Sequence, residues 1–321
     1  MKESGLDTAA RVAVRQCLAV QPSEQVVVVF DAPCQSIARA LWNASRDVGT
    51  ETLLIEMTPR AENGMEPPTP VAAAMSTANV VFAPASKSIT HTEARRSATA
   101  AGARVATLPG ITESIFSRTL VADYEAIRKR TEAIASRIRG KNTVRITTPA
   151  GTDITFSIAG RSVMLDTGIL REPGITNLPA GEAFLAPVEG SGEGVIAVDG
   201  SIGESGILTA PIMFEVRNGL VSTISGHPYA EKLMRAMEAA GPEARNLAEL
   251  GIGTNDSAQL VGHVLEDEKI LGTVHLAFGD NRSMGGSVRA PFHQDGILLR
   301  PSMWVDDEQV MRDGEFITGG K

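Results

Sequence analysis

The sequence predicts an α/β fold, with an N-terminal doubly wound parallel-sheet domain followed by a mainly β (α+β) metal-binding domain. Two observations predict this fold. Over residues 1–140, short apolar runs alternate with amphipathic stretches, as in successive βα units. After Gly140, alternating apolar and polar residues with frequent glycine turns replace that pattern, as in antiparallel sheets. We therefore expect one domain at residues 1–140 and a second at residues 141–321.

The first domain is predicted to contain four parallel strands separated by helices. Its first strand, Gln25–Phe30, is apolar on both faces, as expected where helices cover both sides of a sheet. Asp31-Ala32-Pro33-Cys34 follows this strand in place of a glycine-rich loop, so nucleotide binding is not predicted. The later elements are expected to be a helix at Cys34–Val48, a strand at Thr52–Glu56, a helix at Val71–Thr77, a strand at Asn79–Ala83, a helix at His91–Ala101 and a strand at Ala103–Thr107.

The second domain is predicted to be built mainly from antiparallel strands. A charged helix at Val121–Arg139 leads the chain into it. Thr143–Thr148 and Ile154–Ile158 alternate in polarity around a turn at Pro149-Ala150-Gly151, which is typical of a hairpin. Further elements are expected to be strands at Gly194–Val198, Gly206–Val216, Val274–Phe278 and Gly296–Leu299, and a helix at Tyr229–Ala240.

The composition excludes several functional classes. The chain has 38 acidic and 30 basic residues and a formal charge of −8 without a basic patch, so no nucleic-acid partner is expected. The apolar runs are too short to span a membrane, and the polar N-terminus lacks a signal-peptide core. Cys17 and Cys34 cannot form a disulfide framework for the rest of the chain. We therefore expect a cytoplasmic protein.

Acidic residues and histidines with metal-binding potential gather in the second domain. Three of the five histidines, His263, His275 and His293, lie close in sequence to several carboxylates. The spacing of His293 and Asp295 places both side chains on one face of a strand, within reach of one cation. His275 by itself fits a hydrogen-bonded core histidine as well as a ligand. The clustering favours a metal site.

The chemistry of these residues indicates a catalytic rather than a structural metal site. Imidazole and carboxylate ligands without thiolates suit zinc, cobalt, manganese or iron. The carboxylates exceed what one ion needs, which indicates two divalent ions bridged by a carboxylate, with a further Glu as general base. Water bound to such ions gives a hydroxide nucleophile near neutral pH.

Four segments of the second domain resemble the thermophilic leucyl aminopeptidases of the aminopeptidase T and aminopeptidase S type. These are Leu178–Glu182 with Ala186–Glu189, Glu249–Asn255, Leu265–Glu268 with Gly272–His275, and His293–Asp295. The resemblance implies a cytoplasmic, dimeric metallo-aminopeptidase, a hydrolase that cleaves an amide next to a free amine on a small peptide or peptide-like metabolite, with two divalent ions, zinc or cobalt. It implies that the metal centre is formed by Glu182, Glu249, Glu268, His275, His293 and Asp295. Among these, Glu182 is the candidate base and Glu249 the candidate bridge.

Two features of the sequence keep other functions open. The family tyrosine expected after His275 is missing from Gly279–Gly286, where Arg282 or Asn281 would serve as oxyanion donor, unless Arg282 is an ordinary exposed loop residue. Mononuclear iron dioxygenases that open dihydroxypyridine rings are also similar, but they use a histidine at the position of Glu249. A two-histidine, one-carboxylate iron site would then use His275, His293 and Asp295. A non-catalytic metal-binding protein is the third hypothesis.

Overall fold

The computed structural model describes residues 4–317 and divides the chain into two compact units. The first unit comprises Met1–Arg128 and Asp166–Ala180, and the second comprises Lys129–Leu165 and Gly181–Lys321. The chain therefore contributes a short return segment, residues 166–180, to its first unit. The separation into domains at residue 140 remains a prediction about independent folding.

The first unit is a five-stranded parallel sheet with the strand order β2-β1-β3-β4-β8. β1 (Gln25–Phe30) and β3 (Val80–Ala85) lie inside the sheet and are almost wholly buried, as their unbroken apolar runs predict. Their neighbours are β2 (Glu51–Glu56), β4 (Arg104–Pro109) and β8 (Gly174–Asn177). The return segment supplies β8, which was not predicted because the alternation of strands and helices indicated a sheet contiguous in sequence.

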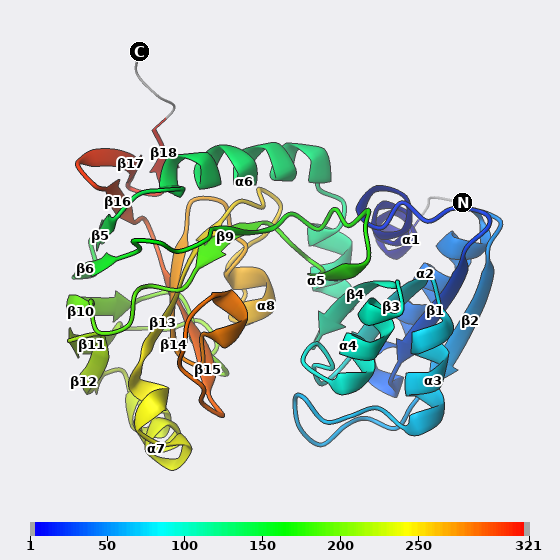
Figure 1. Ribbon diagram of the computed structural model, residues 1–321, viewed down its shortest axis with the longest axis horizontal. Coiled ribbons are helices and arrows are strands. Elements are labelled where there is room, and N and C mark those ends of the chain that lie inside the picture. Colours follow the sequence, from blue (N-terminus) through cyan, green and yellow to red (C-terminus); the bar gives the residue numbers. More distant parts are fainter. Residues whose placement is uncertain (1–3, 318–321) are drawn as a thin grey trace. The chain divides into compact units, whose positions relative to one another are not determined.

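Helices cover this sheet as a doubly wound fold requires. Val27 and Val29 of β1 pack in one apolar cluster with residues of α3 (Thr69–Thr77) and α4 (Glu93–Ala100). α2 (Gln35–Arg46) contacts β1 and β2, and it packs with α1 (Gly5–Arg11) and α5 (Glu113–Thr119). Figure 1 shows these helices around β1–β4. The predicted α/β fold class is confirmed.

The connecting helix α6 (Tyr124–Ile138) begins three residues later than the predicted start at Val121. Asp123 explains the difference, because its carboxylate accepts hydrogen bonds from the backbone amides of Glu125 and Ala126. A side chain that satisfies free amides in this way fixes the first turn of a helix.

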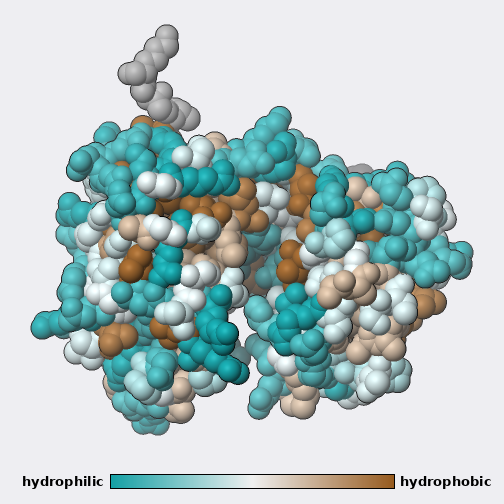
Figure 2. All heavy atoms as spheres, in the orientation of Figure 1, coloured by the Kyte–Doolittle hydropathy of each residue, from teal (hydrophilic) through white to brown (hydrophobic). Residues whose placement is uncertain are grey.

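The second unit contains two antiparallel sheets that share one core. The larger sheet has the order β12-β11-β10-β6-β5-β16-β17-β18, and the smaller one has the order β15-β14-β13-β9-β7. Phe214 and Phe278 stack with ring centroids 4.5 Å apart, and both belong to the apolar cluster that joins the sheets. Polar side chains dominate the visible surface in Figure 2, and apolar ones appear only in small groups.

The strands of the larger sheet follow the predicted hairpin pattern. They are β5 (Thr143–Thr147), β6 (Asp153–Ser157), β10 (Glu193–Val198), β11 (Ile212–Arg217), β12 (Leu220–Gly226), β16 (Ser302–Val305), β17 (Glu308–Arg312) and β18 (Glu315–Phe316). β5 and β6 pair antiparallel, which confirms the predicted hairpin. The strand predicted from Gly206 begins only at Ile212, since Pro211 has no amide hydrogen to donate to a sheet.

The smaller sheet carries the polar cluster described below. Its strands are β7 (Met164–Asp166), β9 (Glu182–Leu185), β13 (Leu247–Gly253), β14 (Val274–Gly279) and β15 (His293–Leu298). β15 begins three residues before the predicted start at Gly296, so His293 and Asp295 both lie on a strand. The helices α7 (Tyr229–Ala240) and α8 (Val264–Asp267) also belong to this unit.

Candidate metal centre

The two faces of the smaller sheet have opposite character. Side chains alternate between the faces of a strand, so the pairing register decides which residues share a face. The apolar face joins the core through Ala183, Leu185, Leu250, Ile252, Val274, Leu276, Phe278 and Leu298. The register places on the other face Glu182, Glu249, Gly251, His275, Ala277, His293 and Asp295. We call this second set the site face.

A bulge in β13 turns Glu249 toward the site face. Leu247 and Leu250 both belong to the apolar core, although strict alternation would place residues three apart on opposite faces. The pairing with β14 shifts between Leu247 and Glu249, and this irregularity absorbs the extra residue, Ala248. Without it, Glu249 would share the face of Leu247. The bulge therefore makes a carboxylate ligand available.

Gly251 makes room for the imidazole of His275. The two residues lie opposite each other on β13 and β14. A Cβ atom at Gly251 would lie only 1.8 Å from His275 Nε2, so any larger residue would displace the ring. Glycine is therefore required here by a close approach.

The site face brings two histidines against shared carboxylates. His293 Nε2 lies 3.2 Å from Glu249 Oε2 and 3.4 Å from Asp295 Oδ1. His275 Nε2 lies 3.6 Å from Glu249 Oε1 and 3.2 Å from Glu182 Oε2. These contacts converge on the Nε2 atoms, which is the arrangement expected where a cation is shared by imidazoles and carboxylates.

Backbone contacts orient His293. Its Nδ1 lies 2.8 Å from the carbonyl oxygen of Asp280. A proton on Nδ1 donated to that oxygen leaves Nε2 unprotonated, which is the tautomer that binds metal. Asp280 lies at the start of the loop that connects β14 to β15, so the placement of this loop bears directly on His293.

Glu189 anchors that loop. Its Oε1 accepts hydrogen bonds from Asn281 Nδ2 at 2.9 Å and from the Ser287 amide at 2.7 Å, and Arg161 pairs with its other oxygen. Burial acts to raise the pKa of Glu189, but the Ser287 and Asn281 hydrogen bonds and the charge of Arg161 outweigh it and lower the pKa to about 2. The loop is therefore held by an ionised carboxylate.

A buried lysine lies among the acidic residues. Lys269 Nζ lies 2.6 Å from Glu182 Oε1 and 2.7 Å from Glu268 Oε1, and its side chain is 1% exposed. This residue was not among the predicted site residues. Its position directly after Glu268, between acidic residues and the apolar Ile270-Leu271, was the available signal.

The carboxylates of the site shift the pKa values of their neighbours. Burial acts to lower the pKa of His275 and of His293, but adjacent carboxylates raise both well above the usual value. Burial acts to raise the pKa of Asp295, but the adjacent His293 outweighs this effect and lowers the pKa to about 2. Burial raises the pKa of Glu268 to about 8 despite Lys269. The site thus strongly favours positive charge, as a cation-binding site does.

Three overlapping groups of side chains are placed to hold a metal ion within residues 4–317. Each has one histidine and two carboxylates whose ligand atoms lie within 4.8 Å of one another: Glu182, Glu249 and His275; Glu249, His293 and Asp295; and Glu268, His275 and Asp295. All six side chains expected as ligands therefore lie in this cluster. The donor set of nitrogen and oxygen atoms fits a catalytic first-row metal ion.

Other residues singled out in the sequence lie elsewhere. Arg282 is exposed in the short helix Arg282–Met284, and its role as an oxyanion donor stays a prediction. Asn281 is buried and binds Glu189, so it supports the loop. Glu266 and Asp267 accept backbone hydrogen bonds from Gln259 and Val261. His263 precedes α8 and belongs to none of the three groups.

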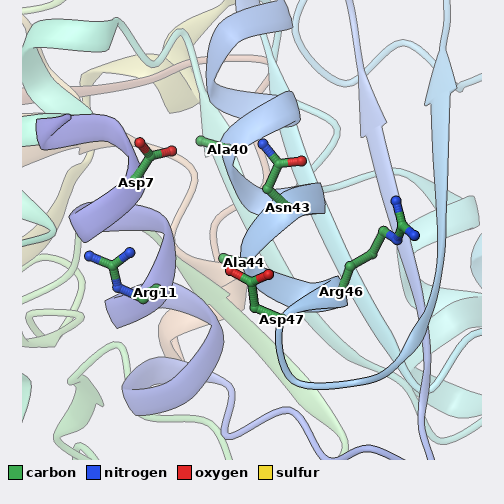
Figure 3. Close-up of a pocket in the computed structure, with 7 residues that line it drawn as sticks. All are labelled: Asp7, Arg11, Ala40, Asn43, Ala44, Arg46 and Asp47. Carbon is green, nitrogen blue, oxygen red and sulfur yellow. The ribbon is translucent and has the colours of Figure 1, made fainter. Parts of the chain in front are cut away.

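The two cysteines and the cavity of the first unit are not part of the metal cluster. Cys17 and Cys34 are both buried and unpaired. A cavity of about 560 Å³ lies between α1 and α2 of the first unit, lined by Asp7, Arg11, Ala40, Asn43, Ala44, Arg46 and Asp47 (Figure 3). None of these side chains belongs to the metal cluster. Within residues 4–317, no helix has the length and apolar character that crossing a membrane requires.

Comparisons with known proteins connect this cluster to a family. The family model of 2,5-dihydroxypyridine 5,6-dioxygenase (NicX) matches residues 7–318. A 2,5-dihydroxypyridine 5,6-dioxygenase from Pseudomonas putida is 24% identical over 206 residues, which cover 59% of this chain and only 58% of that protein's length. The solved 2,5-dihydroxypyridine dioxygenase structure from Pseudomonas putida KT2440 has a TM-score of 0.84 at 19% identity, covering 99% of each chain.

A second solved structure explains the resemblance seen in the sequence. Wild-type AmpT from Thermus thermophilus has a TM-score of 0.73 at 17% identity, covering 98% of this chain and 99% of AmpT. The quoted motifs therefore lie on a fold that this chain shares with both solved proteins, and a shared fold does not by itself identify the activity.

The family match overturns the prediction of an aminopeptidase. The predicted hydrolase and protease activity, and with it the peptide or amide substrate, is wrong. A metal cofactor is consistent with the family and with the three ligand groups, whereas the expected zinc or cobalt has no support. The expected homodimer stays a prediction. Because the family model spans residues 7–318, the chain belongs to the 2,5-dihydroxypyridine 5,6-dioxygenase family.

Proposed function

We propose that the chain is an iron-dependent dioxygenase that opens the ring of a small hydroxylated pyridine. The observation that carries this proposal is the family match over residues 7–318, together with a ligand cluster that lacks thiolates. The same cluster supports one ion held by Glu249, His293 and Asp295, since these residues include the oriented imidazole and the His-x-Asp pair. Three protein ligands leave coordination positions open for small molecules.

The ligand set departs from the one expected for ring-cleaving relatives. The resemblance described above implies a histidine where this chain has Glu249. The proposed set therefore has one histidine and two carboxylates, and the described residues offer no group of His275, His293 and Asp295 within 4.8 Å. The additional carboxylate makes the set more anionic, which favours a hard divalent ion such as iron(II) or manganese(II).

The residues around the ion divide the remaining work. A bound iron(II) ion would supply the open positions at which dioxygen and a substrate hydroxyl meet. Glu182 Oε1 accepts a hydrogen bond from Lys269, while its buried Oε2 lies 3.2 Å from His275 Nε2. We assign Oε2 the role of accepting the proton of a substrate hydroxyl, because it is the oxygen of this carboxylate that is not bonded to Lys269, and a carboxylate can act as a general base. Asp280 keeps His293 in its binding tautomer through this step.

Oxygen uptake tests the proposal. The protein is stripped of metal, reloaded anaerobically with iron(II) and mixed with 2,5-dihydroxypyridine in an oxygen-electrode cell. We expect one dioxygen consumed per ring lost, with both atoms of labelled dioxygen in the product. Loss of the ring without oxygen uptake, or no turnover of any hydroxylated pyridine by the iron-loaded protein, would contradict it.

Two variants make the assay specific to this site. Asp295→Asn should abolish uptake by losing the ion. Glu182→Gln should keep the ion but lower turnover by about 100-fold, the usual contribution of a general base. Glu215→Gln is the matched control. Glu215 is an exposed carboxylate on β11 of the larger sheet and is not part of the metal cluster, so this variant should behave as wild type.

A further inference from the structure

Lys269 is the unusual member of the cluster, because lysine is rarely buried unless its charge is paired. Its ammonium lies between Glu182, which comes from β9, and Glu268, which follows α8. Both N–O distances, 2.6 and 2.7 Å, are those of charge-assisted hydrogen bonds. The ammonium thus joins two carboxylates as a bridging cation does.

The backbone holds Lys269 in this place. Its amide donates to the carbonyl of Glu266 at 2.9 Å, and its carbonyl accepts from the amide of Asn255 at 2.8 Å. Glu266 is fixed in turn, since its carboxylate accepts from the Gln259 amide at 2.8 Å. The next residue, Ile270, packs its carbonyl against Gly253, where a Cβ would lie 2.0 Å away. The lysine side chain therefore starts from a rigid turn.

Lys269 distinguishes the three candidate ligand groups. The group with Glu182 and the group with Glu268 each contain a carboxylate that is already hydrogen-bonded to the ammonium of Lys269. The third group, Glu249, His293 and Asp295, contains neither of these carboxylates. A metal ion in either of the first two groups would share a carboxylate with the ammonium and lie close to it, where two positive charges repel.

We propose that Lys269 takes the position of a second cation and so restricts the centre to one metal ion, held by Glu249, His293 and Asp295. This rests on the location of the site in the proposed function but not on its substrate. The formal charges agree with it. When all four carboxylates of the ligand groups are ionised, they carry four negative charges; Lys269 cancels one and a single divalent ion cancels two, leaving one. A second divalent ion would make the centre positive.

Metal counting tests the proposal directly. Wild type, Lys269→Gln and Lys269→Arg are stripped with a chelator, dialysed to equilibrium against excess manganese(II) without oxygen, and analysed for metal per chain and by electron paramagnetic resonance. We expect one ion with the spectrum of an isolated manganese in wild type and Lys269→Arg. Lys269→Gln should bind a second ion and give the spectrum of a coupled pair.

Several outcomes overturn the proposal. Two ions in wild type would do so, as would one ion in a folded Lys269→Gln protein. If Lys269→Gln fails to fold, Glu182→Gln and Glu268→Gln decide instead. Each should keep one ion with its affinity changed by less than about tenfold, because neither belongs to the occupied group. Loss of the ion in either variant places the metal elsewhere.

The result separates this proposal from the proposed function. One ion in wild type and a second in Lys269→Gln, without oxygen-dependent ring cleavage, would support the lysine's role and contradict the dioxygenase. Two ions in a wild-type protein that is an active dioxygenase would support the proposed function and contradict the role of Lys269.

Discussion

At the scale of single residues, the centre depends on a few atoms that the sheet places within one another's reach. Asp295 and Glu249 both pair across β14 with Ala277, whose small side chain leaves space between the two carboxylates. His293 completes the group, with its Nε2 within 3.4 Å of both. All three residues belong to the proposed ligand group, so substitution of any one of them should lower metal affinity directly.

Asp295→Asn tests this dependence without a change of side-chain size. The amide carries no charge, and the substitution removes a carboxylate whose pKa His293 lowers to about 2 against the effect of burial. Loss of supporting residues around metal ligands costs about 10–100-fold in affinity, so loss of the ligand should cost at least about 100-fold. Competition with a fluorescent chelator measures the effect. An unchanged affinity would remove Asp295 from the ligand set.

Gly251→Ala tests the space beside His275. Its Cβ would meet Nε2 at 1.8 Å, so the ring must move away from Glu182 and Glu249. We expect a loss of about 1–3 kcal/mol in the free energy of unfolding, as for other overpacked cores. Chemical denaturation measures it. Gly174→Ala is the matched control, because there a Cβ meets Leu170 at 3.3 Å; equal losses in both would contradict the close-packing argument.

At the scale of elements, sequence reasoning succeeded where the signal was local. The hairpin β5–β6 and the helix α7 follow from alternation, turn residues and a 3.6-residue apolar period. The His-x-Asp pair was placed on one strand face because alternation is a property of any strand. It failed for β8, which joins the first sheet from a distant segment, and it did not anticipate the bulge that turns Glu249.

The carboxylate of Glu189 holds the loop between β14 and β15 in place through hydrogen bonds from Asn281 and Ser287. Glu189 has a folded-state pKa of about 2, below the ordinary value of 4.5 for a glutamate, so its ionised form stabilises the fold. That stabilisation is complete above about pH 4.5 and is lost as the pH falls toward 2, since the lowered pKa belongs to the folded state. No comparable loss is expected between pH 5 and 8.

Glu189→Gln should therefore loosen the loop at neutral pH. The variant keeps the size of the side chain but weakens the hydrogen bonds from Asn281 and Ser287, which we expect to cost about 1–2 kcal/mol. Hydrogen exchange of the Ser287 amide at pH 7 measures the change, and the free energies of unfolding of the two proteins should converge near pH 2. A difference that persists at that pH would show that the charge is not the cause.

At the scale of the whole molecule, the distribution of ligands explains both the success and the failure of the functional prediction. Every side chain of the three ligand groups belongs to the second compact unit. A metal centre was therefore predictable from the spacing of acids and histidines in one part of the sequence. The reaction was not, because the solved dioxygenase and AmpT share this fold, and a fold does not determine which reaction a site carries out.

The confinement of the ligands to one unit predicts where metal acts on stability. An ion that binds only the folded state adds about 2.7 kcal/mol when its free concentration is 100 times Kd. Removal of the ion by a chelator should therefore speed hydrogen exchange in β13, β14 and β15. The amides of β1 and β3 should be protected equally in both forms, since no ligand lies in their unit. Peptide-resolved exchange with and without manganese(II) measures this. Asp295→Asn is the control, because chelator should have little effect on a protein that binds no ion. Equal deprotection of β1 and β3 would contradict the independence of the two units, because it would mean that they unfold as one cooperative body.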